Sequence, residues 1–314
     1  MMALTTVITG LEARGKGGDA GYPGNWSPAF IRPLIRYFRD LSGKGDRFIV
    51  ADAMVGSGTT KDVCDEDGIA CDAYDLRPDV RGGIGGWNAL KDDLARSVDL
   101  LMIHLPYWDL YRYSLIWGRE PHPDDLSLAP TWEDFVRLAG RVLFRLFASV
   151  KIGGHLLVLM GSIRRRGRLY EMAMDIPKPA PVAHHIIKVQ ENVRSANREY
   201  PTSLIRIAHE DCLIFRRDDP YRFTCKVVKE ATWDLREKPL TWRQAIYAAL
   251  ARLGGRARLP ELYRELQGFA ISRASADYAA TVRGQLQTHP DDFQALGDGV
   301  WALRSHVVVG RKEE

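Results

Sequence analysis

A histidine near the end of an apolar stretch is the residue of this chain whose chemistry is easiest to read. His104 lies in the run Ile-His-Leu-Pro-Tyr-Trp-Asp that covers residues 103–109. A neutral imidazole can accept one hydrogen bond through its unprotonated ring nitrogen. The aromatic residues that follow can stack on a planar ligand or fill a loop core, so the run alone leaves both interpretations open.

A glycine-containing turn and an acidic residue precede this run. The segment 52–60 reads Asp-Ala-Met-Val-Gly-Ser-Gly-Thr-Thr, and Asp75 ends the next predicted strand about twenty residues later. Glycines at such a turn let a ligand approach the backbone closely, and a carboxylate at this spacing can accept hydrogen bonds from both hydroxyls of a ribose. The sequence therefore predicts a nucleoside site. A tight turn that binds nothing is the alternative, and the absence of Gly-x-Gly-x-x-Gly disfavours a pyrophosphate cofactor.

The elements that must position these residues alternate between strand and helix. Short apolar runs at 48–53, 70–74, 98–103, 155–160, 185–189 and 212–215 predict strands, and helical spacing predicts helices over 28–41 and 132–150. Such alternation indicates an α/β fold in which a parallel sheet of about seven strands carries helices on both faces. Residues 1–24 are rich in glycine and charge without any period, which predicts a mobile arm.

The composition narrows the class of protein. Of 314 residues, 46% are hydrophobic, which is enough for a large core, yet no apolar run approaches the roughly 20 residues of a membrane span. Four cysteines stand without zinc spacing, so we expect free thiols and no metal site. The net charge of +4 permits nucleic-acid binding without requiring it. We expect a cytoplasmic, nucleoid-associated protein with no membrane contact.

The ordered set of segments resembles the DNA methyltransferases that methylate exocyclic amino groups, at cytosine N4 or adenine N6. The resemblance covers residues 25–217 and rests on Asn25-Trp26-Ser27-Pro28, the segment 52–60, Asp75, the run 98–109 and the late segment 192–216. It implies a Rossmann-like sheet of seven strands, S-adenosylmethionine as the cofactor and double-stranded DNA as the substrate. It also implies that the target base is flipped out of the duplex.

The same resemblance implies a role for each matching residue. The polar side chain that ends the catalytic strand and the carbonyl of the proline after it hold the target amino group, and the next aromatic residue stacks on the base. The implied catalytic residues are His104, Pro106 and Tyr107. The implied cofactor residues are Ser27, Asp52, Met54, Gly56, Ser57, Gly58, Thr59 and Asp75. Candidate DNA contacts in this part of the chain are Trp108, Arg164, Arg165, Arg166, Arg194 and Asn197.

The chain departs from the family pattern at its most important position. His104 replaces the usual Ser, Asn or Asp, and Leu105 replaces the first proline. Trp87 and Asn88 stand where the family often has an acid. Three interpretations follow: an active enzyme with an unusual acceptor, an enzyme with another target atom or base, and a non-catalytic DNA-binding regulator. If neutral His104 is the acceptor, activity should fall below its ordinary pKa near 6.5.

Residues 239–305 form a second predicted domain. Helical patterns begin at about 240 and 259, a third helix carries Val282, Arg283 and Leu286, and Gly297-Asp298-Gly299 predicts a hairpin turn. The stretch resembles the winged-helix module of some restriction and chromatin proteins, whose third helix can enter a major groove. That resemblance nominates Arg273 and Arg283 as DNA contacts, with protein docking as the alternative. Residues 218–238 are interpreted as a linker and 306–314 as a tail. Dimerisation and a restriction or regulatory partner stay open.

Tyr113 and Trp117 follow the histidine run and have two interpretations. They line a base pocket, or they are core aromatics of a connecting loop.

Overall fold

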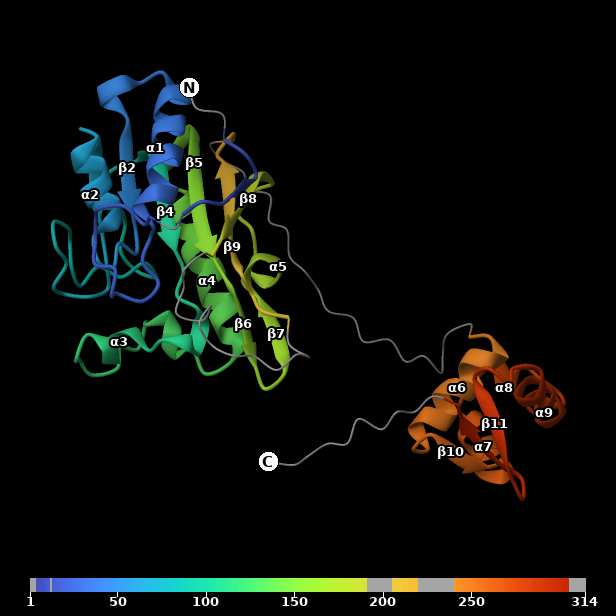
Figure 1. Ribbon diagram of the computed structural model, residues 1–314. Coiled ribbons are helices and arrows are strands. Elements are labelled where there is room, and N and C mark those ends of the chain that lie inside the picture. Colours follow the sequence, from blue (N-terminus) through green and yellow to red (C-terminus); the bar gives the residue numbers. More distant parts are fainter. Residues whose placement is uncertain (1–3, 12, 191–204, 220–239, 305–314) are drawn as a thin grey trace. The chain divides into compact units, whose positions relative to one another are not determined.

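The chain forms two compact units, each with its own hydrophobic core. The computed structural model describes residues 4–11, 13–190, 205–219 and 240–304. The units are Met1–Lys229 and Glu230–Glu314. Figure 1 colours the first from blue to yellow and the second in orange and red. The predicted linker 218–238 and tail 306–314 lie almost entirely outside the described residues.

A seven-stranded sheet organises the first unit. In spatial order its strands are β1 (Val7–Ile8), β8 (Val182–Val189), β9 (His209–Arg216), β5 (Val150–Met160), β4 (Val98–His104), β2 (Ile49–Asp52) and β3 (Ala70–Ala73). Helices α1 (Pro28–Ser42), α2 (Thr59–Glu66) and α4 (Trp132–Phe147) accompany it, with short helices α3 (Tyr113–Ile116) and α5 (Met172–Asp175). The predicted α/β fold with seven strands is confirmed.

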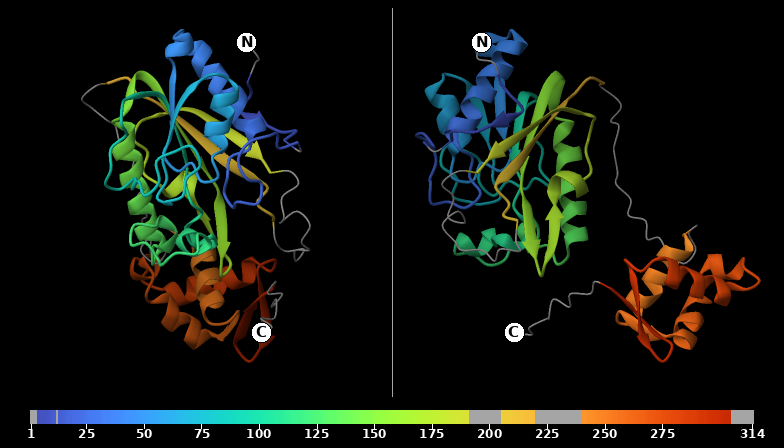
Figure 2. Two further views of the ribbon diagram at one scale, coloured as in Figure 1. Left: turned by 90° about the vertical axis from the view of Figure 1, so that its left-hand side faces the viewer. Right: turned by 45° about the vertical axis from the view of Figure 1, so that its right-hand side comes forward.

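Alternate residues of the central strands point to opposite faces of the sheet and build two cores. Leu100 and Met102 of β4 pack with Phe30 and Leu34 of α1. Leu101 of the same strand packs with α4 and its neighbours on the other face. Because β4 is covered on both faces, all seven of its residues are buried, which is why it reads as a continuous apolar run. Figure 2 shows the helices on both faces of the sheet.

The expectation of an all-parallel sheet is wrong. Strand β9 runs antiparallel to both β5 and β8, with Leu157 opposite Ile214 and Ile186 opposite Cys212. An antiparallel partner needs no helical crossover, and the described residues between β8 and β9, which are 190 and 205–208, contain no helix.

The prediction of a mobile arm over residues 1–24 also needs correction. Val7 and Ile8 form the seventh strand, parallel to Ile187 and Lys188 of β8. Residues 13–24 then pack over the glycine turn that follows β2. The Arg14 guanidinium anchors them, donating to the Asn25 side chain at 2.7 Å. Residues 13–24 form neither a helix nor a strand, so their sequence has no period. Their contacts with residues distant in the sequence hold them in place.

The second unit combines helices with a three-stranded antiparallel sheet. Its helices are α6 (Trp242–Arg252), α7 (Leu259–Leu266), α8 (Ala270–Arg273) and α9 (Tyr278–Thr288). Its strands, in spatial order, are β10 (Arg256–Arg258), β12 (Val300–Leu303) and β11 (Phe293–Gly297). The three predicted helices and the hairpin at Gly297–Gly299 are confirmed as elements. Strand β10 and helix α8 are additional to the prediction.

Candidate functional site

The candidate site is a pocket at the carboxyl ends of β2, β3 and β4. Strand β2 lies between β3 and β4, so the chain leaves β2 toward one side and later returns on the other. Ligands of open α/β sheets bind at such a reversal of strand order. The pocket spans about 710 Å³, part of it open to solvent.

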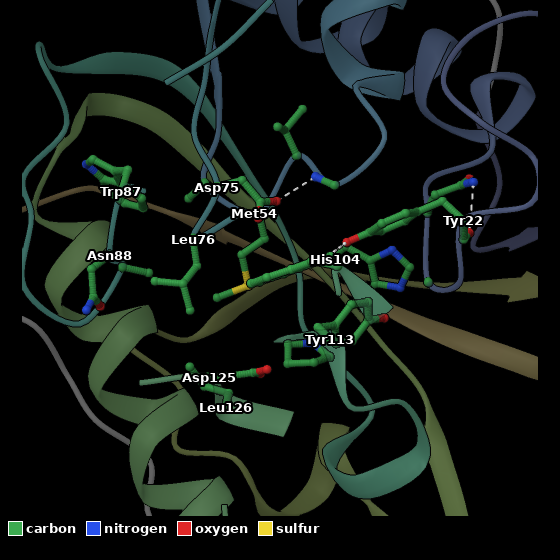
Figure 3. Close-up of a pocket in the computed structure, with 18 of the residues that line it drawn as sticks. Tyr22, Met54, Asp75, Leu76, Trp87, Asn88, His104, Tyr113, Asp125 and Leu126 are labelled. Carbon is green, nitrogen blue, oxygen red and sulfur yellow. Dashed lines mark hydrogen bonds between the residues drawn. The ribbon is translucent and has the colours of Figure 1, made fainter. Parts of the chain in front are cut away.

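Six segments build the pocket walls. They are the N-terminal residues 22–26, the turn 53–56 after β2, the residues 75–76 after β3, the segment 87–89, the end of β4 with Pro106, and a stretch between 113 and 126. Figure 3 shows Met54, Asp75 and Leu76 near one another, with His104 and Tyr113 on the opposite side. Of the residues predicted from the sequence, five line this pocket: Met54, Gly56, Asp75, His104 and Pro106.

The turn after β2 and the carboxylate of Asp75 form one hydrogen-bonded unit. Gly56 adopts φ +54°, and its backbone N–H donates to Asp75 Oδ2 at 2.7 Å. The backbone N–H of Arg77 donates to Asp75 Oδ1 at 2.8 Å. Burial raises the pKa of Asp75, and these two donors oppose that shift. Each carboxylate oxygen retains a further lone pair, so the group can still accept bonds from a ligand.

Other residues predicted to bind the cofactor support the wall without lining the pocket. The carboxylate of Asp52 accepts from the Trp26 indole at 3.1 Å and from Thr60 Oγ1 at 2.5 Å. Burial raises its pKa to about 7. Ser27 caps α1 without a side-chain cap bond, and its hydroxyl instead faces the carbonyl of Arg14 at 3.5 Å.

The N-terminal segment covers Ser57, Gly58 and Thr59. A Cβ on Gly18 would lie 2.1 Å from Thr59 Oγ1 and 2.6 Å from Ser57 Oγ, so only glycine fits there. The Tyr22 ring lies over Gly56, whose Cβ would lie 2.9 Å from it. The three predicted residues are therefore buried beneath residues 17–22.

His104 belongs to a buried network that links β4 with β8 and β9. Its Nε2 lies 2.8 Å from the hydroxyl of Tyr107. That hydroxyl donates to Glu210 Oε1, and the ammonium of Lys188 donates to Glu210 Oε2. Nδ1 of His104 is buried and has no hydrogen-bond partner among the described residues. One ring nitrogen is thus held by protein while the other is unpaired.

The electrostatics of this network overturn the expected pH dependence. Burial lowers the pKa of His104 to about 3, and the nearby Lys188 lowers it as well. Burial also lowers the pKa of Lys188 to about 8 and raises that of Glu210 to about 8. A His104 whose pKa burial lowers well below 6.5 stays neutral near that pH, so we no longer expect its titration to reduce activity there.

Pro106 lines the pocket, whereas Leu105, Tyr107 and Trp108 do not. Leu105 is buried in the sheet core, and Tyr107, which packs against Gly161, is not a lining residue. Trp108 packs against Trp132 and its indole N–H donates to a backbone carbonyl at 3.0 Å. Tyr107 and Trp108 are therefore committed to internal contacts in this structure.

The predicted arginines after the fifth strand form a β-hairpin. Strands β6 (Ser162–Arg165) and β7 (Arg168–Glu171) pair around Arg166 and Gly167, which both have positive φ. Arg165 pairs with Asp109 at 2.9 Å, and Arg166 is exposed at the turn. The predicted contacts Arg194 and Asn197 lie outside the described residues.

The two arginines nominated in the second unit are on different helices. Arg283 is exposed on α9 and donates to the Tyr263 hydroxyl at 3.2 Å. Arg273 ends the short helix α8, where it donates to the carbonyl of Gly268, so it is not part of the third predicted helix.

Several pocket residues escaped the sequence-based prediction. The Asp124 carboxylate accepts hydrogen bonds from Lys91 and from the Asn88 amide. Both bonds lower the pKa of Asp124. Asp125 accepts from Ser114 and Ser127 and so fixes the loop. Tyr113 and Trp117 also line the pocket. No group of potential metal ligands exists among the described residues, and none of the described helices has the length and apolarity to cross a membrane.

The composition of the lining is acidic and aromatic. It includes Asp75, Asp124 and Asp125, and it contains no lysine or arginine among the described residues. An acidic cavity of this kind suits a cationic ligand and disfavours a phosphate-bearing one.

Comparisons with known proteins find distant structural likenesses. No family model and no curated protein sequence matches the chain. TrmN from Thermus thermophilus is 14% identical with a TM-score of 0.36, and the match covers 59% of this chain and 48% of that one. An amino pentose methyltransferase from Micromonospora echinaspora, CalS10 with bound SAM, is 15% identical with a TM-score of 0.26, covering 45% of this chain and 58% of that one.

A third likeness covers more of its counterpart. It is the 1,6-didemethyltoxoflavin-N1-methyltransferase of Burkholderia thailandensis, bound to S-adenosylhomocysteine. It is 16% identical with a TM-score of 0.33, and the match covers 61% of this chain and 80% of that one. The chain spans about half the length of the first two proteins. Likenesses of this degree do not identify a family, a cofactor or a substrate.

Proposed function

We propose that the first unit is a methyltransferase that uses S-adenosylmethionine to methylate an exocyclic amino group of a DNA base, cytosine N4 or adenine N6. The observation that carries the proposal is the meeting of Gly56, Asp75 and His104 in one pocket at the sheet reversal. Gly56 and Asp75 fit a nucleoside, and His104 offers an acceptor a short way along the same cavity. The second unit is proposed as a winged helix that adds affinity for DNA.

The pocket fits S-adenosylmethionine in charge and shape. The Asp75 carboxylate has lone pairs left for ribose hydroxyls, and the apolar side chains of Met54, Leu76 and Leu126 give a planar base a surface to lie on. The sulfonium and amino groups of this cofactor are positive, which agrees with a lining that carries carboxylates and no basic side chain among the described residues. When bound, the cofactor supplies an electrophilic methyl group.

His104 and Pro106 would hold the target amino group. Nδ1 of His104 is buried and has no partner among the described residues, and it would accept one N–H of that group if the entering base reaches it, while the carbonyl of Pro106 would accept the other. Both contacts orient the nitrogen lone pair toward the methyl carbon, and positioning of this kind accounts for much of the rate in such transfers. Because burial lowers the pKa of His104 to about 3, the ring acts as a hydrogen-bond acceptor and not as a general base.

Base stacking is assigned to aromatic residues of the pocket. Tyr113 and Trp117 line the cavity, whereas Tyr107 and Trp108 are held in internal contacts. The proposal therefore keeps His104 and Pro106 as the polar contacts that the resemblance implies. It assigns base stacking to Tyr113 and Trp117 in place of Tyr107.

DNA contacts are proposed for both units. The hairpin of β6 and β7 carries Arg164, Arg165, Arg166 and Arg168, a density of positive charge that suits phosphates. In the second unit the helices α6, α7 and α9 and the hairpin of β11 and β12 follow the order of a winged helix, in which α9 would be the recognition helix. Arg283 on α9 is the proposed groove contact.

Methyl transfer from labelled S-adenosylmethionine to mixed-sequence duplex DNA tests the proposal. We expect incorporation by the full chain and strongly reduced incorporation at low cofactor concentration by an Asp75→Asn variant, while the matched Asp72→Asn variant keeps activity because Asp72 pairs with Arg96 outside the pocket. Digestion of the product to nucleosides identifies the methylated base. Cofactor and DNA binding without transfer at any pH between about 6 and 9 would support the non-catalytic regulator instead, and incorporation into RNA alone would refute the DNA substrate.

A further inference from the structure

The buried network around His104 fixes which ring nitrogen carries the proton. Glu210 Oε1 has no hydrogen to give when Lys188 bonds to the other oxygen, because the proton shared by that pair lies between Lys188 Nζ and Oε2. This holds as long as the Glu210 carboxyl is ionised, the state in which both of its oxygens only accept hydrogen bonds, one of them from the Lys188 ammonium. The Tyr107 hydroxyl must therefore donate to Glu210, as its geometry indicates.

A hydroxyl has a single hydrogen, so its donation decides the next contact. The Tyr107 oxygen can only accept from His104, whose Nε2 lies 2.8 Å away. A neutral histidine carries one ring proton, and this contact places it on Nε2. The lone pair of the neutral ring is then on Nδ1, the nitrogen that has no partner among the described residues.

We propose that Glu210, acting through the hydroxyl of Tyr107, holds His104 as the tautomer with its proton on Nε2 and so leaves Nδ1 as the acceptor for the substrate. Glu210 is a positioning residue in this scheme, since it touches neither cofactor nor substrate. The inference rests on the function proposed above, because that function gives the Nδ1 lone pair its use.

Burial makes the arrangement specific. His104 and Glu210 have side chains that are 3% and 5% exposed, so water does not compete for these hydrogen bonds. The groups that face His104 come from four elements: Trp26 before α1, Tyr107 after β4, Lys188 on β8 and Glu210 on β9. Among these only Tyr107 contacts an imidazole nitrogen at hydrogen-bond distance.

An isosteric change at Glu210 should reverse the direction of the chain of hydrogen bonds. In Glu210→Gln the Lys188 ammonium takes the amide oxygen, which turns the amide NH₂ toward Tyr107. At about pH 6 the ammonium persists, because burial lowers the pKa of Lys188 only to about 8. Tyr107 then receives a bond from the amide and donates its own hydrogen to His104 Nε2. The His104 proton must move to Nδ1.

Nitrogen-15 NMR of histidine-labelled full-length protein reads the tautomer directly, without cofactor or substrate. The signals of His104 are assigned by their absence in His104→Gln. We expect protonated Nε2 in the parent protein and protonated Nδ1 in Glu210→Gln. Asp211→Asn is the matched control, a carboxylate-to-amide change at the next residue of β9 that leaves the Tyr107 contact in place.

The outcomes separate this inference from the proposed function. A parent protein with the proton on Nδ1, or a Glu210→Gln variant with the proton still on Nε2, overturns the role of Glu210 whether or not the protein transfers methyl groups. If the tautomer shifts as expected, methyl transfer by Glu210→Gln should fall at least tenfold with an unchanged dissociation constant for the cofactor. A tautomer shift with full activity would overturn the use of Nδ1 as the acceptor.

Discussion

Asp75→Asn isolates the contribution of one carboxylate to cofactor binding. In the protein each oxygen of Asp75 already accepts one backbone N–H, from Gly56 at 2.7 Å and from Arg77 at 2.8 Å. One lone pair on each oxygen is left for the two ribose hydroxyls. The amide retains a single acceptor oxygen without charge and directs its NH₂ toward a backbone donor, so it loses at least one charge-assisted bond to the ligand.

The size of the loss follows from that count. A hydrogen bond to a charged group contributes about 1.5–3 kcal/mol, and 1.4 kcal/mol corresponds to a tenfold change in affinity. The dissociation constant for S-adenosylmethionine should therefore rise about 10- to 100-fold. The backbone donor left without an acceptor should also lower the free energy of unfolding by about 1–3 kcal/mol.

Isothermal titration calorimetry with S-adenosylhomocysteine measures the affinity, and thermal unfolding measures the stability of the same samples. Asp72→Asn is the control, because it makes the same chemical change on β3 in a pair with Arg96 that lies outside the pocket. An Asp75→Asn variant that is folded and binds the ligand as tightly as the parent protein would show that this carboxylate does not contact the ribose.

Three further predictions test the turn, the hairpin and the histidine. In Gly56→Ala the new Cβ would lie 2.9 Å from the Tyr22 ring at a residue with φ +54°, so calorimetry should show weaker cofactor binding. The control Gly82→Ala changes a residue with φ +66° outside the pocket and should lower the free energy of unfolding by only about 1–2 kcal/mol. Arg166→Gln should reduce the slope of log affinity for DNA against log salt by about one, and an unchanged slope would contradict a phosphate contact. His104 stays neutral in the folded protein because burial lowers its pKa to about 3 from 6.5, so its contribution to stability is lost as pH falls below 6.5. In denaturant titrations between about pH 6 and 4, His104→Gln should therefore lose about 1.4 kcal/mol less per pH unit than the parent protein, and equal slopes would refute the neutral histidine.

Local patterns predicted the strands and the residues at their ends. A strand buried on both faces, such as β4, is mostly apolar, and this signal placed it within one residue of its observed end at His104. The spacing from the glycine turn to Asp75 likewise follows from one helix and one strand of ordinary length, α2 and β3. These features depend on residues close in sequence, which is why the sequence sufficed.

Long-range pairing was not predictable in the same way. The side-chain period of a strand is the same in either direction, so the apolar pattern of β9 could not reveal that it runs antiparallel to β5. The contacts of Gly18 with Thr59 and of Tyr22 with Gly56 join segments about 35 to 40 residues apart. Their sequence shows only glycines and polar residues, which is also the composition of a mobile arm.

The orientation of Tyr107 depended on a residue 103 positions away. Sequence reasoning gave it a stacking role because it occupies the aromatic position of the resembled motif. The structure holds its hydroxyl between His104 and Glu210, an acidic partner on β9 whose place in the sheet the local sequence does not reveal. A buried acid next to an antiparallel strand partner is visible only once the strands are paired.

The histidine at position 104 and the orientation of the Tyr107 ring are linked. A histidine at position 104 brings a ring N–H that must find an acceptor in a buried place, and the Tyr107 hydroxyl is the acceptor that the structure supplies. That hydroxyl in turn needs Glu210, so the aromatic ring is held in place and is withdrawn from any stacking role. A serine at 104 would leave Tyr107 without this tie. His104→Ser should therefore release Tyr107 from His104 without restoring the parent activity, because Glu210 still binds the hydroxyl, whereas a double change to His104→Ser and Glu210→Leu frees the ring. Tyrosine fluorescence quenching by added nucleoside, greater in the double variant than in either single variant, would support this coupling, and equal quenching in all of them would refute it.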